Sequence, residues 1–172
     1  MPSLAVTVIG RDRPGIIAEV TRVVADRGGN LEDSSMTLLR GHFAWMLIAD
    51  VDATAQDIAA DLSHLREDGL VVSVLPVGQD QPYADDSPRY MLSVHGADHP
   101  GIVAGVTATI AKHGGNITDL STRLGPGGLY LLVAEVALPS DVEVAALGAQ
   151  LAEAGLRLGV GVSLRPADSD VL

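Results

Sequence analysis

Apolar residues in the first half of the chain change from a strand-like run to helical spacing within a few residues. Leu4–Ile9 is short and mostly apolar, as expected of a buried strand. Ile17, Val20 and Val24 then recur at i, i+3 and i+7, which places them on one face of a helix. Gly28 and Gly29 supply a left-handed stop after that helix. The pattern therefore predicts a strand followed by an amphipathic helix.

The same reasoning, carried along the chain, predicts the order strand, helix, strand, strand, helix, strand, and predicts it twice. The first set is Leu4–Ile9, a helix from Pro14 to Gly28, Leu31–Leu39, Phe43–Val51, a helix capped by Thr54 that runs through Ile58, Leu62 and Leu65 to Gly69, and Leu70–Val77. The second set is Tyr90–His95, Pro100–His113, Asn116–Leu124, Leu129–Val136, Val142–Ala154 and Leu156–Leu164, with Leu156, Leu158, Val160 and Val162 on one face of the last strand. This order predicts an α+β protein of two ferredoxin-like βαββαβ units, each with an antiparallel sheet and its helices on one face.

The two halves are copies of one another. Gly10–Leu38 and Gly96–Leu124, offset by 86 residues, are identical at 15 of 29 positions. We therefore expect a first domain over residues 1–77, a polar linker over 78–88, a second domain over 89–165 and a flexible tail over 166–172.

Composition narrows the classes of function. The formal net charge is −11 and aromatic residues make up 3% of the chain, so we expect no direct binding to nucleic acid. The absence of cysteine excludes disulfides and thiolate chemistry and favours a reducing compartment. No signal peptide and no apolar run of membrane-spanning length is visible, so we expect a cytoplasmic protein that does not enter a membrane.

Two of the predicted strands are apolar on both faces. Phe43, Trp45 and Leu47 alternate with Ala44, Met46 and Ile48, and Leu129–Val136 behaves similarly. One helix layer covers only one face of such a sheet, so the other face needs a cover of its own. We expect the two units to dock on each other and the chain to form a homodimer.

The repeated turn Asp-x-Pro-Gly carries the candidate chemistry. It brings the free amides of a helix start to the surface, and Gly15 and Gly101 leave room for a ligand to approach the backbone. Asn30 and Asn116 follow the same helices, and a carboxamide can contact a carboxylate and an ammonium together. These features suit a free amino acid. Each is equally a plain turn or helix-stop signal, and duplication copies structural features as faithfully as functional ones.

These repeated motifs, Asp12-Arg13-Pro14-Gly15-Ile16 with Gly29-Asn30 and Asp98-His99-Pro100-Gly101-Ile102 with Gly115-Asn116, resemble those of ACT domains. The tandem layout is similar to that of the glycine cleavage system transcriptional repressor family. The resemblance implies ligands held at a domain interface by the backbone near Gly15 and Gly101 and by Asn30 and Asn116, with Asp12 and Asp98 shaping the turn or meeting the ammonium. The ligand-binding residues that it marks are Asp12, Arg13, Pro14, Gly15, Ile16 and Asn30, and Asp98, His99, Pro100, Gly101, Ile102 and Asn116.

The functional hypothesis that follows is a sensor of a small amino acid such as glycine or serine. It would act through protein contact, with a DNA-binding regulator as partner. Two alternatives stay open, a regulatory subunit of an amino-acid-metabolism enzyme and a ligand-free interaction scaffold. No convergent acid, base or nucleophile is visible, and His95 and His99 are separated by a turn, so we expect no enzyme activity, no metal and no cofactor.

Overall fold

The computed structural model describes residues 1–78 and 87–167, which belong to two compact units. The described residues of unit 1 are 1–78 and those of unit 2 are 87–167. Most of the expected linker (79–86) and of the expected tail (168–172) lies outside the described residues. Pro166, which we had assigned to the tail, is the last residue of a strand and pairs with Tyr90.

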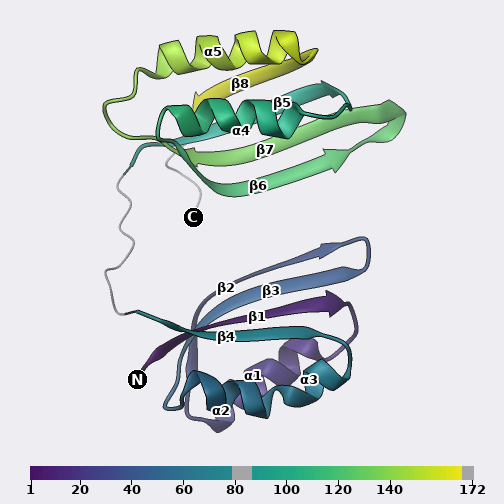
Figure 1. The fold of residues 1–172 in the computed structure, drawn as a ribbon, viewed down its shortest axis with the longest axis vertical. Helices are drawn as coiled ribbons and strands as arrows, with labels where there is room; N and C mark the ends of the chain where they lie inside the picture. The colour runs from purple at the N-terminus through teal and green to yellow at the C-terminus, as the bar shows by residue number, and fades with distance from the viewer. Residues whose placement is uncertain (79–86, 168–172) are drawn as a thin grey trace. The chain divides into compact units, whose positions relative to one another are not determined.

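Unit 1 is one antiparallel sheet with its helices on one side (Figure 1). The strands lie in the order β2-β3-β1-β4, so the hairpin partner β2 and the last strand β4 are the two edges. The elements are β1 (Ser3–Arg11), α1 (Ile16–Asp26), β2 (Asn30–Leu39), β3 (His42–Asp50), α2 (Ala55–Asp61), α3 (Ser63–Glu67) and β4 (Val71–Val77).

The second helix of unit 1 is broken, where we had predicted one continuous helix. Thr54 caps α2 as predicted, and its hydroxyl accepts a bond from the Asp57 amide at 3.2 Å. At Leu62 the chain tightens into a turn in which the Leu65 amide donates to the Leu62 carbonyl at 3.1 Å. Ile58, Leu62 and Leu65 all stay buried, so the break keeps the apolar face on the sheet.

Unit 2 repeats the topology, with the order β6-β7-β5-β8. Its elements are β5 (Arg89–Ala97), α4 (Ile102–Lys112), β6 (Asn116–Leu124), the short η1 (Pro126–Gly128), β7 (Leu129–Ala137), α5 (Val144–Arg157) and β8 (Val160–Pro166).

The predicted start of the last strand was wrong. Leu156 lies in α5 and is 82% exposed, and Leu158 caps that helix. Gly159, with φ 63°, reverses the chain, and β8 begins only at Val160. Apolar residues two apart at Leu156, Leu158 and Val160 imitated a strand because they straddle this helix end.

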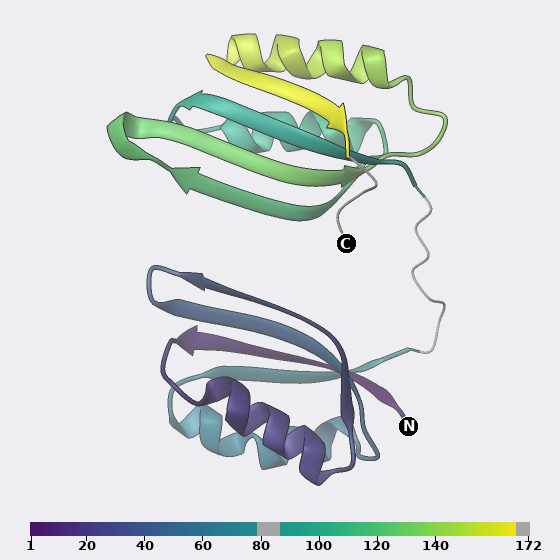
Figure 2. The ribbon, with the colours of Figure 1, turned by 180° about the vertical axis from the view of Figure 1, so that it is seen from behind.

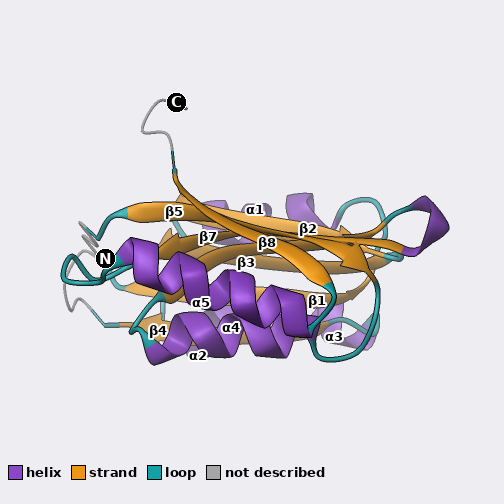
Figure 3. Ribbon diagram, turned by 90° about the horizontal axis from the view of Figure 1, so that it is seen from above, coloured by secondary structure: helices purple, strands orange, loops and turns teal. Residues whose placement is uncertain are grey.

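Each unit has its own core between sheet and helices. In unit 1, Leu4, Val6 and Val8 of β1 pack against Val20 and Val24 of α1. Leu92 and Val94 of β5 and Val106 and Ile110 of α4 do the same in unit 2. The view from behind shows each unit's helices on a single face of its sheet (Figure 2), and the view from above colours the helices purple and the strands orange (Figure 3). The predicted α+β ferredoxin-like fold is confirmed.

The opposite face of each sheet is exposed and largely apolar. In unit 1, Ile9, Met46 and Leu75 are each about half or more exposed, and in unit 2 Leu131 and Val133 are exposed. What covers these faces stays a prediction. Within the described residues, no helix has the length and apolar content needed to cross a bilayer.

Candidate functional site

The link between β1 and α1 forms a sharp corner, which we call corner 1 (residues 12–18). The Asp12 amide donates to the carbonyl of Gly41, at the tip of the β2–β3 hairpin, at 3.0 Å. Gly15 is the helix N-cap and has φ 97°, a conformation that side chains disfavour. We had expected Pro14 in the first helical turn. It instead precedes the cap, because the left-handed Gly15 places the helix start at Ile16.

The amides at the start of α1 are available to a ligand. No side chain caps the helix, and its first internal bond runs from the Glu19 amide to the Gly15 carbonyl at 2.9 Å. The amides of Ile16, Ile17 and Ala18 consequently have no acceptor within the helix. Together with the helix dipole they favour an anionic group such as a carboxylate.

These amides border an open hollow of about 480 Å³. Its wall on the turn side is the backbone of corner 1, and its remaining walls are apolar side chains from α1, β2 and β3. The lining residues are Asp12, Arg13, Pro14, Gly15, Ile16, Ile17, Ala18, Met36, Leu38 and Phe43. Five predicted site residues, Asp12 to Ile16, are thus brought together around one hollow.

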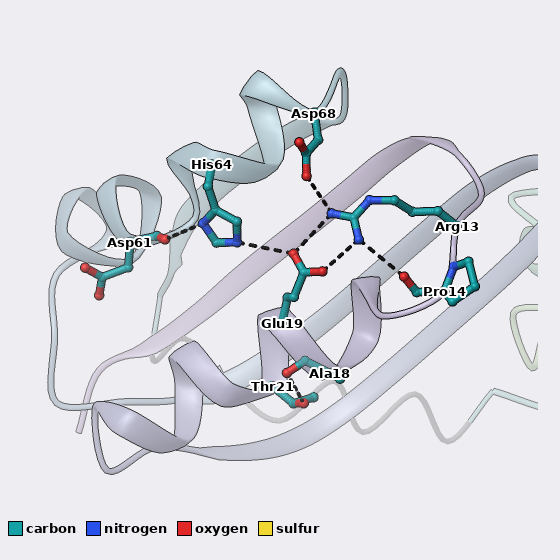
Figure 4. Close-up of polar contacts among 8 residues, drawn as sticks. All are labelled: Arg13, Pro14, Ala18, Glu19, Thr21, Asp61, His64 and Asp68. Carbon is teal, nitrogen blue, oxygen red and sulfur yellow. Dashed lines mark hydrogen bonds and ion pairs between the residues drawn. The ribbon is translucent and has the colours of Figure 1, made fainter.

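The Arg13 guanidinium is already paired with acidic side chains of its own unit, so it is less available to a ligand. Its guanidinium donates to both oxygens of Glu19, at 2.7 and 3.1 Å, and to Asp68 at 2.7 Å (Figure 4). His64 lies 3.3 Å from the same Glu19 carboxylate. The bond from Arg13 lowers the pKa of Glu19 below its ordinary value. Arg13, Glu19, His64 and Asp68, which we call the Arg13 cluster, tie corner 1 to the α3 end of the unit.

The matching corner 2 (residues 98–104) has the same backbone and different side chains. Gly101 has φ 96°, the Gly105 amide donates to its carbonyl at 2.9 Å, and Asp98 donates to the Gly128 carbonyl at 3.2 Å. Its Gly105 replaces the carboxylate of Glu19. The His99 ring bonds to the Leu158 carbonyl and to the Pro100 carbonyl. Asp98 to Ile102 are therefore also brought together.

The structure does not bring Asn30 or Asn116 to the corner of its own unit. Asn30 starts β2 opposite Asp50, whereas the hollow meets β2 near its other end, at Leu38. Eight residues at a strand rise of about 3.3 Å separate these positions by roughly 26 Å. Asn116 likewise starts β6, at the end opposite Leu124.

Sequence reasoning missed the apolar walls Ile17, Met36, Leu38 and Phe43 and the partners His64 and Asp68. Met36 and Leu38 alternate along β2 and could have been assigned to the helix side from the strand period. Asp68 is 55 residues from Arg13, and only the sheet order brings the two together.

Comparison with known proteins identifies the family. The ACT domain family matches residues 3–74 and again residues 90–145. The chain is a tandem ACT-domain protein. The first match spans nearly all of unit 1, and the second runs from β5 of unit 2 to the start of α5.

Three similar proteins illustrate the relationship. A UPF0237 protein of Methanopyrus kandleri is 43% identical over 43% of this chain and 82% of its own length. The glycine cleavage system transcriptional repressor of Escherichia coli is 30% identical, over 72% of this chain and 65% of the repressor. A crystal structure of an unknown protein from Galdieria sulphuraria, 29% identical, superposes with a TM-score of 0.82, covering 96% of this chain and 98% of the other.

Proposed function

We propose that this tandem ACT-domain protein is a regulator that binds a free amino acid and signals through contact with another protein. The observation that carries the proposal is the hollow at corner 1, where three uncapped amides lie beside apolar walls. A zwitterion suits this place because its carboxylate can accept from the amides while Asp12 meets its ammonium.

We propose that a second copy of the chain supplies the rest of the site. β2 is an unpaired sheet edge, and strand edges pair readily with one another. If two β2 edges pair antiparallel, the Asn30 end of one lies alongside the Leu38 end of the other. That pairing would place an Asn from one ACT domain next to corner 1 of another. We therefore propose a homodimer in which the ligand bridges two units.

The kind of regulation is suggested by a relative and by charge. The relative from Escherichia coli is named a transcriptional repressor. A chain with net charge −11 is repelled by DNA, so a role in transcription would pass through a DNA-binding protein. Ligand binding can change that contact only by favouring one arrangement of the units over another.

Thermal unfolding against a panel of the twenty amino acids tests the proposal. A ligand at ten times its dissociation constant stabilises the native state by about 1.4 kcal/mol, which raises the melting temperature by several degrees. The double variant Asn30→Ala, Asn116→Ala should abolish this shift. The control Gln150→Ala removes an exposed carboxamide from α5 and should leave it intact.

Sedimentation in the presence and absence of the stabilising amino acid tests the bridging. We expect the ligand to increase the dimer fraction in the wild type and not in the double variant. A panel in which none of the twenty amino acids changes the melting temperature would refute the binding proposal.

A further inference from the structure

The hollow at corner 1 is unusually apolar for a place that would receive only glycine or serine. Ile17, Met36 and Leu38 are 43%, 47% and 50% exposed, and all three line it. They come from two different elements, the first turn of α1 and the far end of β2. Three half-exposed large apolar side chains around one opening present a surface that an apolar group would remove from water.

The floor of the hollow is fixed by the core. Phe43 is 2% exposed and its ring meets that of Trp45 edge-on, with centroids 6.4 Å apart and an interplanar angle of 67°. Ile16 beside it is also 2% exposed. The floor therefore keeps its shape, while the half-exposed walls are free to close on a ligand.

Unit 2 carries more polar residues at the matching positions. Phe43 and Tyr130 match, because they lie opposite Gly10 and Gly96 in equivalent strands. Met36 and Thr122 match as well, because each lies opposite the residue two positions after this aromatic residue. Val103 and Leu124 replace Ile17 and Leu38. Two hydroxyl groups thus take the place of apolar atoms.

We infer that the ligand of corner 1 is an amino acid with an apolar aliphatic side chain, such as leucine, isoleucine, valine or methionine. The side chain lies on Ile17, Met36 and Leu38, and these three residues determine specificity. This inference rests on the proposed function and replaces the glycine or serine that the sequence suggested. The hydroxyl-bearing positions of unit 2 make corner 2 less selective for apolar side chains.

Titration calorimetry on the full chain tests the specificity, with glycine, serine, valine, leucine and methionine as ligands. One methylene in an apolar pocket changes affinity by about 10-fold or more. We therefore expect leucine to bind at least about tenfold more tightly than glycine. Met36→Thr, which gives corner 1 the residue of unit 2, should reduce the leucine-to-glycine ratio to below about threefold.

Met46→Thr is the matched control. Met46 is 51% exposed on the other face of the sheet and does not line this hollow, so the same substitution there should leave the ratio unchanged. Tighter binding of glycine or serine than of leucine, or a ratio insensitive to Met36→Thr, would overturn the specificity while the sensor function stands. Binding of none of the five, together with no stabilisation by the remaining amino acids, would remove both.

Discussion

The two corners of this protein share a backbone and differ in what holds it. Gly15 and Gly101 have φ 97° and 96°, and each corner donates one amide to the tip of its hairpin. Corner 1 adds the Arg13 cluster, in which Arg13 is held by Glu19 and Asp68. Corner 2 instead attaches His99 to the backbone of the helix end at Leu158.

The substitution that separates the corners is small. Where unit 1 has Glu19, unit 2 has Gly105, and a Cβ at Gly105 would lie 2.9 Å from the Leu158 side chain. Leu158 and Asp68 occupy matching positions, each followed by a left-handed glycine and then by the last strand. An ion pair in one repeat is thus replaced by apolar packing in the other. Duplication preserved the amides of the corner and left their supports free to diverge.

The largest difference between the units should appear at Gly10 and Gly96, where the central strand passes the last strand. A Cβ on Gly96 would meet Val160, at 2.7 Å from Cγ1 and 3.0 Å from Cα. A Cβ on Gly10 would meet the end of the Leu70 side chain at 2.5 Å from Cδ2, and the Leu70 backbone only at 3.3 Å from Cα. We expect Gly96→Ala to destabilise unit 2 by about 2–3 kcal/mol and Gly10→Ala to cost unit 1 about 1–2 kcal/mol.

Unfolding followed by two probes measures this pair. Trp45, the single tryptophan, is buried in the core of unit 1, so its fluorescence reports that unit, and circular dichroism reports both. Gly148→Ala in α5, where a Cβ meets nothing within 4 Å, is the control and should stabilise unit 2 by about 0.5–1 kcal/mol. A larger loss at Gly10 than at Gly96 would show that the closer approach to the neighbouring backbone at Gly96 does not decide the loss of stability.

Gly15→Ala and Gly101→Ala should have the next largest effect. Both force alanine into a left-handed conformation, at about 1–2 kcal/mol each. Gly15→Ala also places its Cβ 3.3 Å from Glu19 Oε1, whereas Gly101 has open space around it. We expect unit 1 to lose slightly more stability than unit 2, measured with the same probes. Equal losses would mean that the Arg13 cluster moves aside at no cost.

The smallest predicted effect is a pH dependence confined to unit 1. The pKa of Glu19 is lowered in the folded state by its bond from Arg13, so this carboxylate stabilises the fold above its ordinary pKa of 4.5 and the contribution is lost as the pH falls through the lowered value. Glu19→Gln should therefore reduce the loss of stability between pH 6 and pH 3, by less than about 1 kcal/mol because the pair is partly exposed.

Trp45 fluorescence in denaturant titrations at the two pH values provides the measurement. The control Glu153→Gln removes a carboxylate from a more exposed pair with Arg157 on α5, in unit 2, and should leave the pH dependence of unit 1 unchanged. An acid-induced loss in unit 1 that is identical with and without Glu19 would contradict the assignment.

Sequence reasoning succeeded where local pattern decides the structure. The repeat, the element order and the strand Asn116–Leu124 were predicted as observed, because apolar period and glycine stops act over a few residues. The break at Leu62 and the start of β8 at Val160 were missed, because the apolar residues around each keep the spacing of an uninterrupted helix or strand.

The candidate site was predictable only in part, for a physical reason. The turn residues Asp12 to Ile16 are contiguous, so their motif marks them. The walls of the hollow are not contiguous with the turn, and Met36 and Leu38 reach it only through the register of β2 on β3. The position of Asn30 relative to corner 1 could not be read from the motif, because helix and strand lengths decide which end of the sheet a residue occupies. Its part in binding stays a prediction.

The bond from Asp12 to the Gly41 carbonyl, repeated between Asp98 and Gly128, has a mechanical consequence. The β2–β3 hairpin lies at the end of the edge strand β2, and its Gly41 carbonyl accepts the hydrogen bond from the amide of Asp12 in corner 1. A protein that binds the edge strand β2 would therefore contact the hairpin to which the backbone of corner 1 is hydrogen-bonded. One hydrogen bond in each unit therefore joins the candidate ligand-binding backbone to the hairpin that carries the edge strand.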